Sequence, residues 1–143
     1  MATFLIKTEP GDYSYDDLVR DGRTSWTGVA NTAAQMHMRT IRTGDECLVY
    51  HTGNEKRIVG LARVVRGAYA DPAHPGTTAR GEPRRVLFDI EPVKPATSDA
   101  ATLAAIKADA RFADLALVRQ GRLSVMPVPP RLDRALRTLA GLD

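Results

Sequence analysis

The sequence lacks the features that mark several large classes of protein. A single cysteine, Cys47, can form neither an internal disulfide nor a zinc site built from several cysteines. A reducing compartment, the cytoplasm, is therefore the expected location. No run approaches the roughly 18 apolar residues that a membrane helix needs. The apolar residues 4–6 are too few for the core of a signal peptide. We therefore expect neither export nor a membrane partner.

Motifs for phosphate, metal or nucleophilic chemistry are also missing. The glycines form no phosphate-binding loop. The three histidines, His37, His51 and His74, show no spacing typical of metal ligands. Cys47 and His51 would share one face of a strand, but about 13 Å apart at ~3.3 Å per residue. That is too far for a nucleophile and its base. We expect no cofactor, no metal and a buried, inert thiol.

The composition is that of one ordinary globular domain spanning residues 1–143. Charged residues make up 26% of the chain, and the formal net charge is +3. Sixteen arginines stand against four lysines. Arginine favours forked contacts with phosphate and stacking on bases. The 20 alanines beside it equally suggest a GC-rich genome, so the charge by itself does not indicate nucleic acid.

Apolar patterning predicts short strands with helices between them. We expect strands at residues 4–6, 47–51, 58–65, 86–91 and 123–128. Expected helices lie between Ser14 and Gly22, at 32–41, from a cap at Ser98 and Asp99 to about residue 109, and from residue 130 to about 139. Residues 70–83 read as a long exposed loop. Strands spread along the chain with inserted helices favour an α+β fold, a small mixed barrel surrounded by helices.

Trp26 is the most informative single residue. It is the only tryptophan, and it lies in a polar, aperiodic segment, residues 22–31. Such a segment runs near the surface, so the indole either caps the core or lines a pocket. Lys7, Asn31 and Ser124 could supply hydrogen bonds to a planar polar ligand. From the residues alone, both interpretations of Trp26 stay open.

Five segments in order resemble the signature of EVE-domain proteins, members of the PUA-like superfamily. They are Lys7-Thr8-Glu9-Pro10 with Tyr13-Ser14 and Asp17-Leu18; Trp26-Thr27-Gly28-Val29-Ala30-Asn31; Met38-Arg39 with Gly44-Asp45; Tyr50-His51; and Val118-Arg119 with Arg122-Leu123-Ser124-Val125-Met126-Pro127. Three departures stand out. Ala30 replaces the arginine of the W-x-G-V-R-N pattern, residues 32–35 replace Tyr-Gln-Ala-Arg, and residues 86–88 lack a tryptophan that is often found there.

The resemblance implies a PUA-like mixed β-barrel of about five to six strands with flanking helices, akin to YTH and ASCH domains. It implies a module that recognises a modified base of DNA or RNA, single-stranded or flipped out of a duplex. Trp26 would stack on the base, Ser14 and Asn31 would read its edge, and Lys7, Arg119 and Arg122 would face phosphate or a ring acceptor. The candidate ligand-binding residues are Trp26, Asn31, Ser14, Tyr13, Lys7, His51, Arg119, Arg122 and Ser124.

Two other functions stay open at this point. ASCH-type relatives include small hydrolases and nucleases that act on modified nucleosides or RNA, and Glu9, His51 and Lys7 are the candidates for a general base. A partner-binding protein whose pocket has decayed would also explain Ala30. The oligomeric state is not encoded in any pattern that we find.

Overall fold

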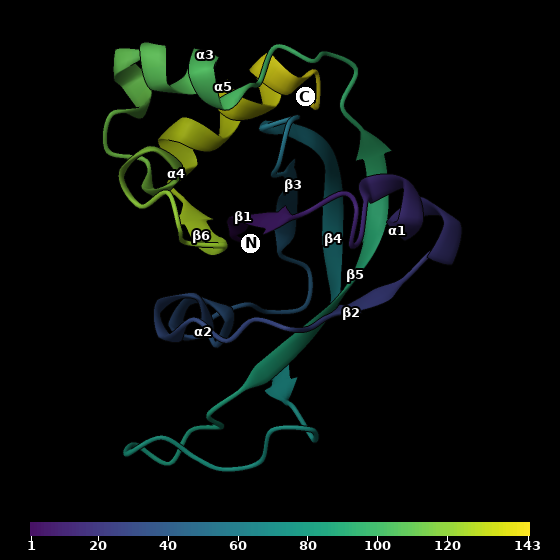
Figure 1. Ribbon diagram of the computed structural model, residues 1–143, viewed down its shortest axis with the longest axis vertical. Coiled ribbons are helices and arrows are strands. Elements are labelled where there is room, and N and C mark those ends of the chain that lie inside the picture. Colours follow the sequence, from purple (N-terminus) through teal and green to yellow (C-terminus); the bar gives the residue numbers. More distant parts are fainter.

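The structure, a computed structural model, describes residues 1–143 and contains one six-stranded mixed sheet with helices packed around it (Figure 1). The strands are β1 (Thr3–Thr8), β2 (Thr24–Trp26), β3 (Glu46–His51), β4 (Arg57–Ala70), β5 (Val86–Pro95) and β6 (Val125–Val128). The helices are α1 (Tyr15–Asp21), α2 (Thr32–Met38), α3 (Leu103–Ala108), α4 (Ala116–Arg119) and α5 (Pro130–Ala140), with a 3₁₀ turn at Ala110–Phe112.

The strand order is β2-β5-β4-β3-β1-β6, and only the β1–β3 pair is parallel. The α+β class and the six strands are confirmed. The edge strands β2 and β6 do not pair with each other, so the sheet is open rather than a closed barrel. The long strands β4 and β5 shift register at several points, which is how bulges bend a sheet.

One core of 34 buried apolar residues lies along the sheet and beneath the helices. The predicted strands supply most of it, and β3 is buried throughout, as its apolar run indicates. Cys47 is fully buried there, as expected. None of the helices is long and apolar enough to cross a membrane.

Local capping explains where several helices begin. The Ser14 hydroxyl accepts a hydrogen bond from the Asp17 N–H (3.0 Å), and the Asp17 carboxylate accepts one from the Ser14 N–H (2.9 Å). This is the predicted capping box, with Asp in place of the usual Glu. Gly22 ends the helix in the left-handed conformation (φ 74°), which costs glycine little.

Two predictions about the elements are wrong, and two short elements were not predicted. Residues 24–26 form an edge strand, β2, where we expected an irregular segment. The third helix begins after Thr102, which caps it through the Ala105 N–H, and not after Ser98 and Asp99. The helix α4 and the 3₁₀ turn before it were not predicted. Each of these elements has at most six residues, too few to show a period.

Arg137 on α5 is largely enclosed by the protein. Its guanidinium donates to Asp133 (2.8 Å) and Thr3 (3.0 Å) and pairs with the buried Glu46 carboxylate (2.9 Å). Its side chain is 17% exposed. The ion pair joins α5 to β3. It also explains why the Glu46 carboxylate can be buried, because a buried charge is tolerated only with a partner of this kind.

Gly60 on β4 provides a test of the packing. A Cβ there would overlap the ring of Tyr15, whose hydroxyl donates to Leu61 O (2.7 Å) and whose N–H donates to His51 Nε2 (3.0 Å). The ring cannot retreat without breaking these bonds. We expect Gly60→Ala to lower the free energy of unfolding by about 1–3 kcal/mol, the usual effect of overpacking. Urea unfolding measures it. Gly121→Ala, where nothing lies within 4 Å, is the control; equal losses in both variants would contradict this account.

Candidate functional site

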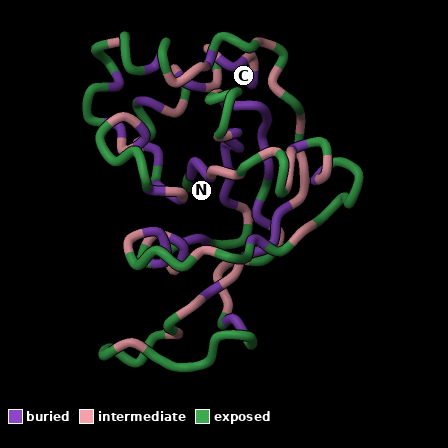
Figure 2. Tube along the Cα trace, in the orientation of Figure 1, coloured by how far each residue is buried: buried purple, intermediate pink, exposed green.

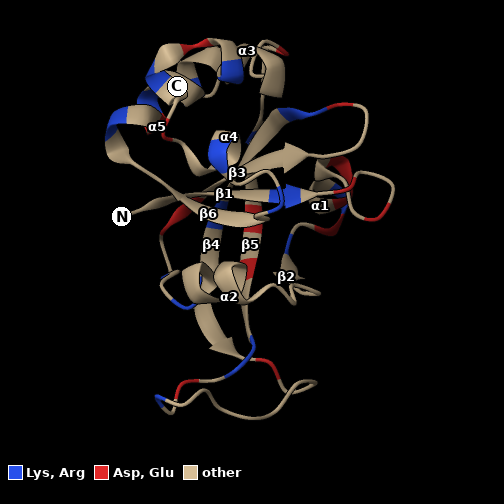
Figure 3. Ribbon diagram, turned by 60° about the vertical axis from the view of Figure 1, so that its left-hand side comes forward, with Lys and Arg blue, Asp and Glu red and all other residues tan.

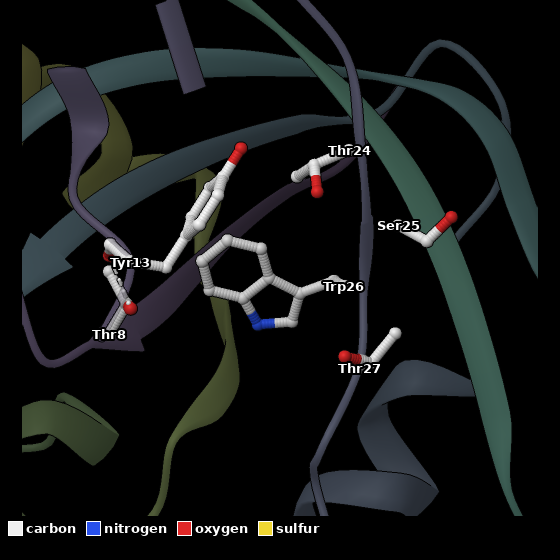
Figure 4. A pocket seen from close by; sticks show the side chains of 6 residues that line it. All are labelled: Thr8, Tyr13, Thr24, Ser25, Trp26 and Thr27. Atoms are coloured by element: carbon white, nitrogen blue, oxygen red, sulfur yellow. Dashed lines mark hydrogen bonds between the residues drawn. The ribbon is translucent and has the colours of Figure 1, made fainter. Parts of the chain in front are cut away.

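A pocket of about 180 Å³ opens where the end of β1, the start of α1 and strand β2 meet (Figure 4). Its lining residues are Thr8, Tyr13, Thr24, Ser25, Trp26 and Thr27. At about 30 Å³ per water, the space equals roughly six water molecules. That is below the usual range for drug-sized ligands, and it suits a single ring system.

Two aromatic rings set the shape of this pocket. The Tyr13 and Trp26 rings meet edge to face, with centroids 6.5 Å apart and an angle of 84° between their planes. Behind the indole lies Phe88, its partner across the β2–β5 pair, at 6.4 Å and 31°. Trp26 is only 8% exposed and belongs to the core. The two interpretations of Trp26 therefore both hold: the indole caps the core and also lines the pocket.

Tyr13 is fixed from two sides. Its hydroxyl donates to Asp21 at the end of α1 (2.8 Å), and its carbonyl accepts from the Thr8 hydroxyl (2.7 Å). Partial burial raises the pKa of Tyr13, and the Asp21 carboxylate raises it further. The phenol is thus a neutral hydrogen-bond donor at physiological pH. Ser14 follows it in sequence, but its hydroxyl is the helix cap, turned to the α1 N-terminus.

The other candidate ligand-binding residues lie outside this pocket. Lys7 lines a second hollow of about 180 Å³ beside Tyr50, donates to Gly121 O (3.0 Å) and lies 5.7 Å from the centre of the Tyr50 ring. Burial lowers the pKa of Lys7. Ser124 is its neighbour through the backbone, where Ser124 O accepts from the Lys7 N–H (2.9 Å).

Asn31 and Arg122 meet in a third hollow, of about 270 Å³, between the start of α2 and the turn before β6. The side-chain oxygen of Asn31 (Oδ1) caps α2 by accepting from the Ala34 N–H (2.9 Å). This leaves the side-chain nitrogen of Asn31 free to donate. Arg119 is elsewhere, exposed on α4 and paired with Asp114 (3.0 Å). The structure brings Trp26 and Tyr13 together and distributes the remaining residues over separate surfaces.

His51 is held by two hydrogen bonds. Its Nε2 accepts from the Tyr15 N–H (3.0 Å), and its Nδ1 lies 3.0 Å from the Glu55 carboxylate. Since an accepting Nε2 carries no proton, the Nδ1 hydrogen points at Glu55. The ring, 6% exposed, anchors α1 to β3.

A family model described as the EVE domain matches residues 2–137, nearly the whole chain. The chain belongs to the EVE domain family. Rpa0253 from Rhodopseudomonas palustris, a solved structure, is 40% identical to it, with a TM-score of 0.86 over 99% of this chain and 94% of that one.

Human thymocyte nuclear protein 1 is 27% identical over 111 residues, which are 64% of this chain and 49% of that protein. The EVE domain described here thus spans about half the length of the curated relatives that it matches. A crystal structure of the human THYN1 protein in complex with DNA containing 5-methylcytosine aligns with a TM-score of 0.82 at 23% identity, over 96% of this chain and 97% of that one.

Two departures of this EVE domain from the family pattern lie at one place in the structure. Ala30 and Gln35 both line a hollow that also receives Arg39 from the end of α2, and Arg84 and Arg85 from the 71–85 loop. Ala30, Gln35 and Arg39 stood out in the sequence only through the family pattern, and nothing there gave a role to Arg84 or Arg85.

Cys47 yields a direct test of the claim that its thiol has no chemical role. Burial raises its pKa far above the usual range, with help from Asp45 and Glu46, so no thiolate forms. Cys47→Ser should leave ligand binding unchanged. It should cost about 1–3 kcal/mol of stability, because a hydroxyl is buried without a designed partner. Denaturant unfolding and a binding titration check this; lost binding at unchanged stability would contradict it.

Proposed function

We propose that this EVE domain binds nucleic acid and holds a modified base in the pocket between Tyr13 and Trp26, without catalysing a reaction. The observation that carries the proposal is the right-angled pair of aromatic rings at a small opening on the surface (Figure 4). A base that enters can contact the indole on one side and the edge of the phenol on another.

The energetics of this arrangement favour a nucleobase as the ligand. Stacking of a base on an aromatic side chain is worth about 1–3 kcal/mol. A methyl group buried in the same pocket adds roughly 0.8 kcal/mol. The hydroxyl groups of Thr24 and Thr27 flank the indole along the chain and offer hydrogen bonds to polar ring atoms (Figure 4). A modified base therefore gains over an unmodified one by contact with the pocket wall.

The relatives support the same ligand class. The human THYN1 protein was crystallised with DNA that contains 5-methylcytosine. We infer that this chain also takes a base with an added alkyl group. Unpairing a base from a duplex costs a few kcal/mol, so a single strand or an already weakened pair is the better ligand.

The residues that line the pocket do not favour a hydrolase. It contains no carboxylate, histidine, lysine or cysteine that could act as a general base. Of the three candidates named from the sequence, Glu9 accepts hydrogen bonds from Gly11 (3.1 Å) and Thr52 (3.3 Å), and His51 and Lys7 are engaged as described above. This is the basis on which we propose a binding module.

Titration with short single-stranded oligonucleotides tests the proposal. One oligonucleotide carries a central 5-methylcytosine, and a second has plain cytosine in an otherwise identical sequence. We expect saturable binding, tighter for the methylated strand, with the strand recovered intact by chromatography afterwards. New products would show an enzyme instead. Equal affinity for both strands would rule out reading of the methyl group.

A further inference from the structure

A cationic hollow of about 410 Å³ lies between α2 and the 71–85 loop. Arg39, Arg84 and Arg85 line it together with the hydroxyl-bearing Thr32 and Thr78, and no carboxylate is among its lining residues. The loop projects from one end of the sheet (Figure 1) and is exposed over most of its length (Figure 2). Guanidinium and hydroxyl groups around an open hollow are suited to an anion.

The three arginines have different tasks. Arg39 is committed to the loop: its Nε donates to Pro83 O and its Nη2 to Arg84 O, both at 3.1 Å. Arg84 and Arg85 form no ion pair and no side-chain hydrogen bond within the chain. The nearby Asp71 carboxylate is hydrogen-bonded to His74 (3.0 Å) and interacts with Arg85 only through its charge at longer range. The Arg84 and Arg85 guanidinium groups are therefore available to a ligand, while the two bonds from Arg39 fix the backbone of the loop beside them.

This hollow is tied to the Trp26 pocket through the buried amide of Gln35. Gln35 donates to Val29 O (2.8 Å) and accepts from the Val86 N–H (2.9 Å). The amide thereby clamps the segment after β2 against the start of β5. Ala30, which lines the hollow, is four residues from Trp26. Four extended residues span at most about 13 Å. Arg85 is three residues before Phe88, the β5 partner of Trp26, and three extended residues span at most about 10 Å. One strand of duplex DNA carries a phosphate about every 3.4 Å of helix axis, so the phosphates next to a base in the Trp26 pocket lie within reach of the loop.

We propose that Arg84 and Arg85 bind backbone phosphates of the same strand whose base enters the Trp26 pocket. Arg39 is a positioning residue that holds the loop in place for this contact. The inference rests on the proposed function, because it takes the position of the strand from the base in the pocket. It adds that the chain binds a polynucleotide and not merely a free nucleoside.

The salt dependence of binding is the measurement. The methylated oligonucleotide is titrated at several salt concentrations against the wild type and Arg84→Ala/Arg85→Ala. Each lost phosphate contact should reduce the log–log slope by about 0.7–0.9, so we expect a change of about 1.5. Affinity for the free nucleoside 5-methyl-2′-deoxycytidine should stay the same. Arg84→Lys/Arg85→Lys, which keeps the charge, should restore most of the slope. The substituted side chains are not part of the core, and melting temperatures confirm that the variants fold.

A matched control changes the charge equally at the other end of the molecule. Arg131→Ala/Arg134→Ala removes two exposed arginines that line a separate hollow. They belong to α5, which lies at the opposite end of the molecule from the 71–85 loop (Figures 1 and 3). This variant should keep the wild-type slope apart from a small, non-specific change. Equal changes in both double variants would show a general charge effect and overturn the proposal, as would an unchanged slope in the Arg84 and Arg85 variant.

Failure of the proposed function gives a different pattern. If methylated and plain oligonucleotides bind equally and Trp26 is not involved, but the slope still depends on Arg84 and Arg85, the phosphate site stands and the base pocket does not. If the nucleoside binds and the wild-type oligonucleotide slope is near zero, the base pocket stands and the phosphate site is wrong. No binding of either ligand rejects both.

Discussion

Trp26→Ala is expected to weaken binding of the methylated oligonucleotide by about 5- to 150-fold, the factor that corresponds to 1–3 kcal/mol of stacking. It should also lower the free energy of unfolding by about 3–5 kcal/mol, the usual cost of cutting a buried large aromatic side chain to alanine. Both effects follow from one position, because the indole packs on Phe88 and faces the pocket beside Tyr13. The losses are measured by binding titration and by denaturant unfolding, with binding followed at a temperature where the variant is folded.

Separating the two effects needs variants that change one contact at a time. Phe88 lies behind the indole, is fully buried and does not line the pocket, so Phe88→Leu removes a ring from the core alone. It should cost stability and leave affinity nearly intact. Trp26→Phe should keep most of the packing and lose part of the stacking. Trp26 is the only tryptophan, so its emission in the wild type reports the pocket alone, and bound base should quench it. Unquenched emission, with affinity lost equally in the Phe88 variant, would show a core residue and nothing more.

Much of the fold could be predicted because the spacing of apolar residues, and the residues that begin and end an element, act locally. Strands with long apolar runs, such as β3, and the helix between Ser14 and Gly22 are specified by their own residues. β2 has three residues and is a strand only because β5 supplies hydrogen bonds from residues more than 60 positions later. Ser98 and Thr102 are both residue types that cap helices, and a tertiary contact favours the second, since the Leu103 N–H donates to Lys56 O across the molecule. Contacts between distant segments leave no pattern in the local sequence.

The candidate site was predictable in part for the same reason. Trp26 is conspicuous because it is unique and lies among polar residues, and Tyr13 lies in a recognisable segment. The hydroxyl-bearing side chains around them, and the arginines of the 71–85 loop, come from segments whose proximity depends on how the sheet curls. Gln35 stood out only as a departure from the family pattern, because a glutamine in a short helix is ordinary until both of its amide partners are visible.

Gln35→Met is therefore expected to have an effect that its sequence context does not suggest. The methionine matches the length of glutamine but leaves Val29 O and the Val86 N–H without partners. Gln35 is 4% exposed, so water cannot easily replace them. Each orphaned buried group costs about 1–3 kcal/mol, and the apolar side chain recovers part of this. We expect a net loss of about 2–4 kcal/mol in urea unfolding. Met36→Ala, at the exposed next position of α2, should change stability by about 0.5 kcal/mol or less.

Gln35→Glu adds a pH dependence to the same test. The carboxylate can still accept from the Val86 N–H, but it cannot donate to Val29 O, and burial of its charge raises its pKa above the ordinary value of about 4.3. A group whose folded pKa is raised favours the folded state at low pH and loses that contribution as the pH rises through the folded pKa. The stability deficit of Gln35→Glu should therefore shrink between pH 7 and pH 5, as the neutral acid donates its proton to Val29 O, while the deficit of Gln35→Met stays constant. Parallel pH curves for the two variants would show that residue 35 does not bridge the two segments. The pocket and the arginine hollow would then have to be held in place by other contacts.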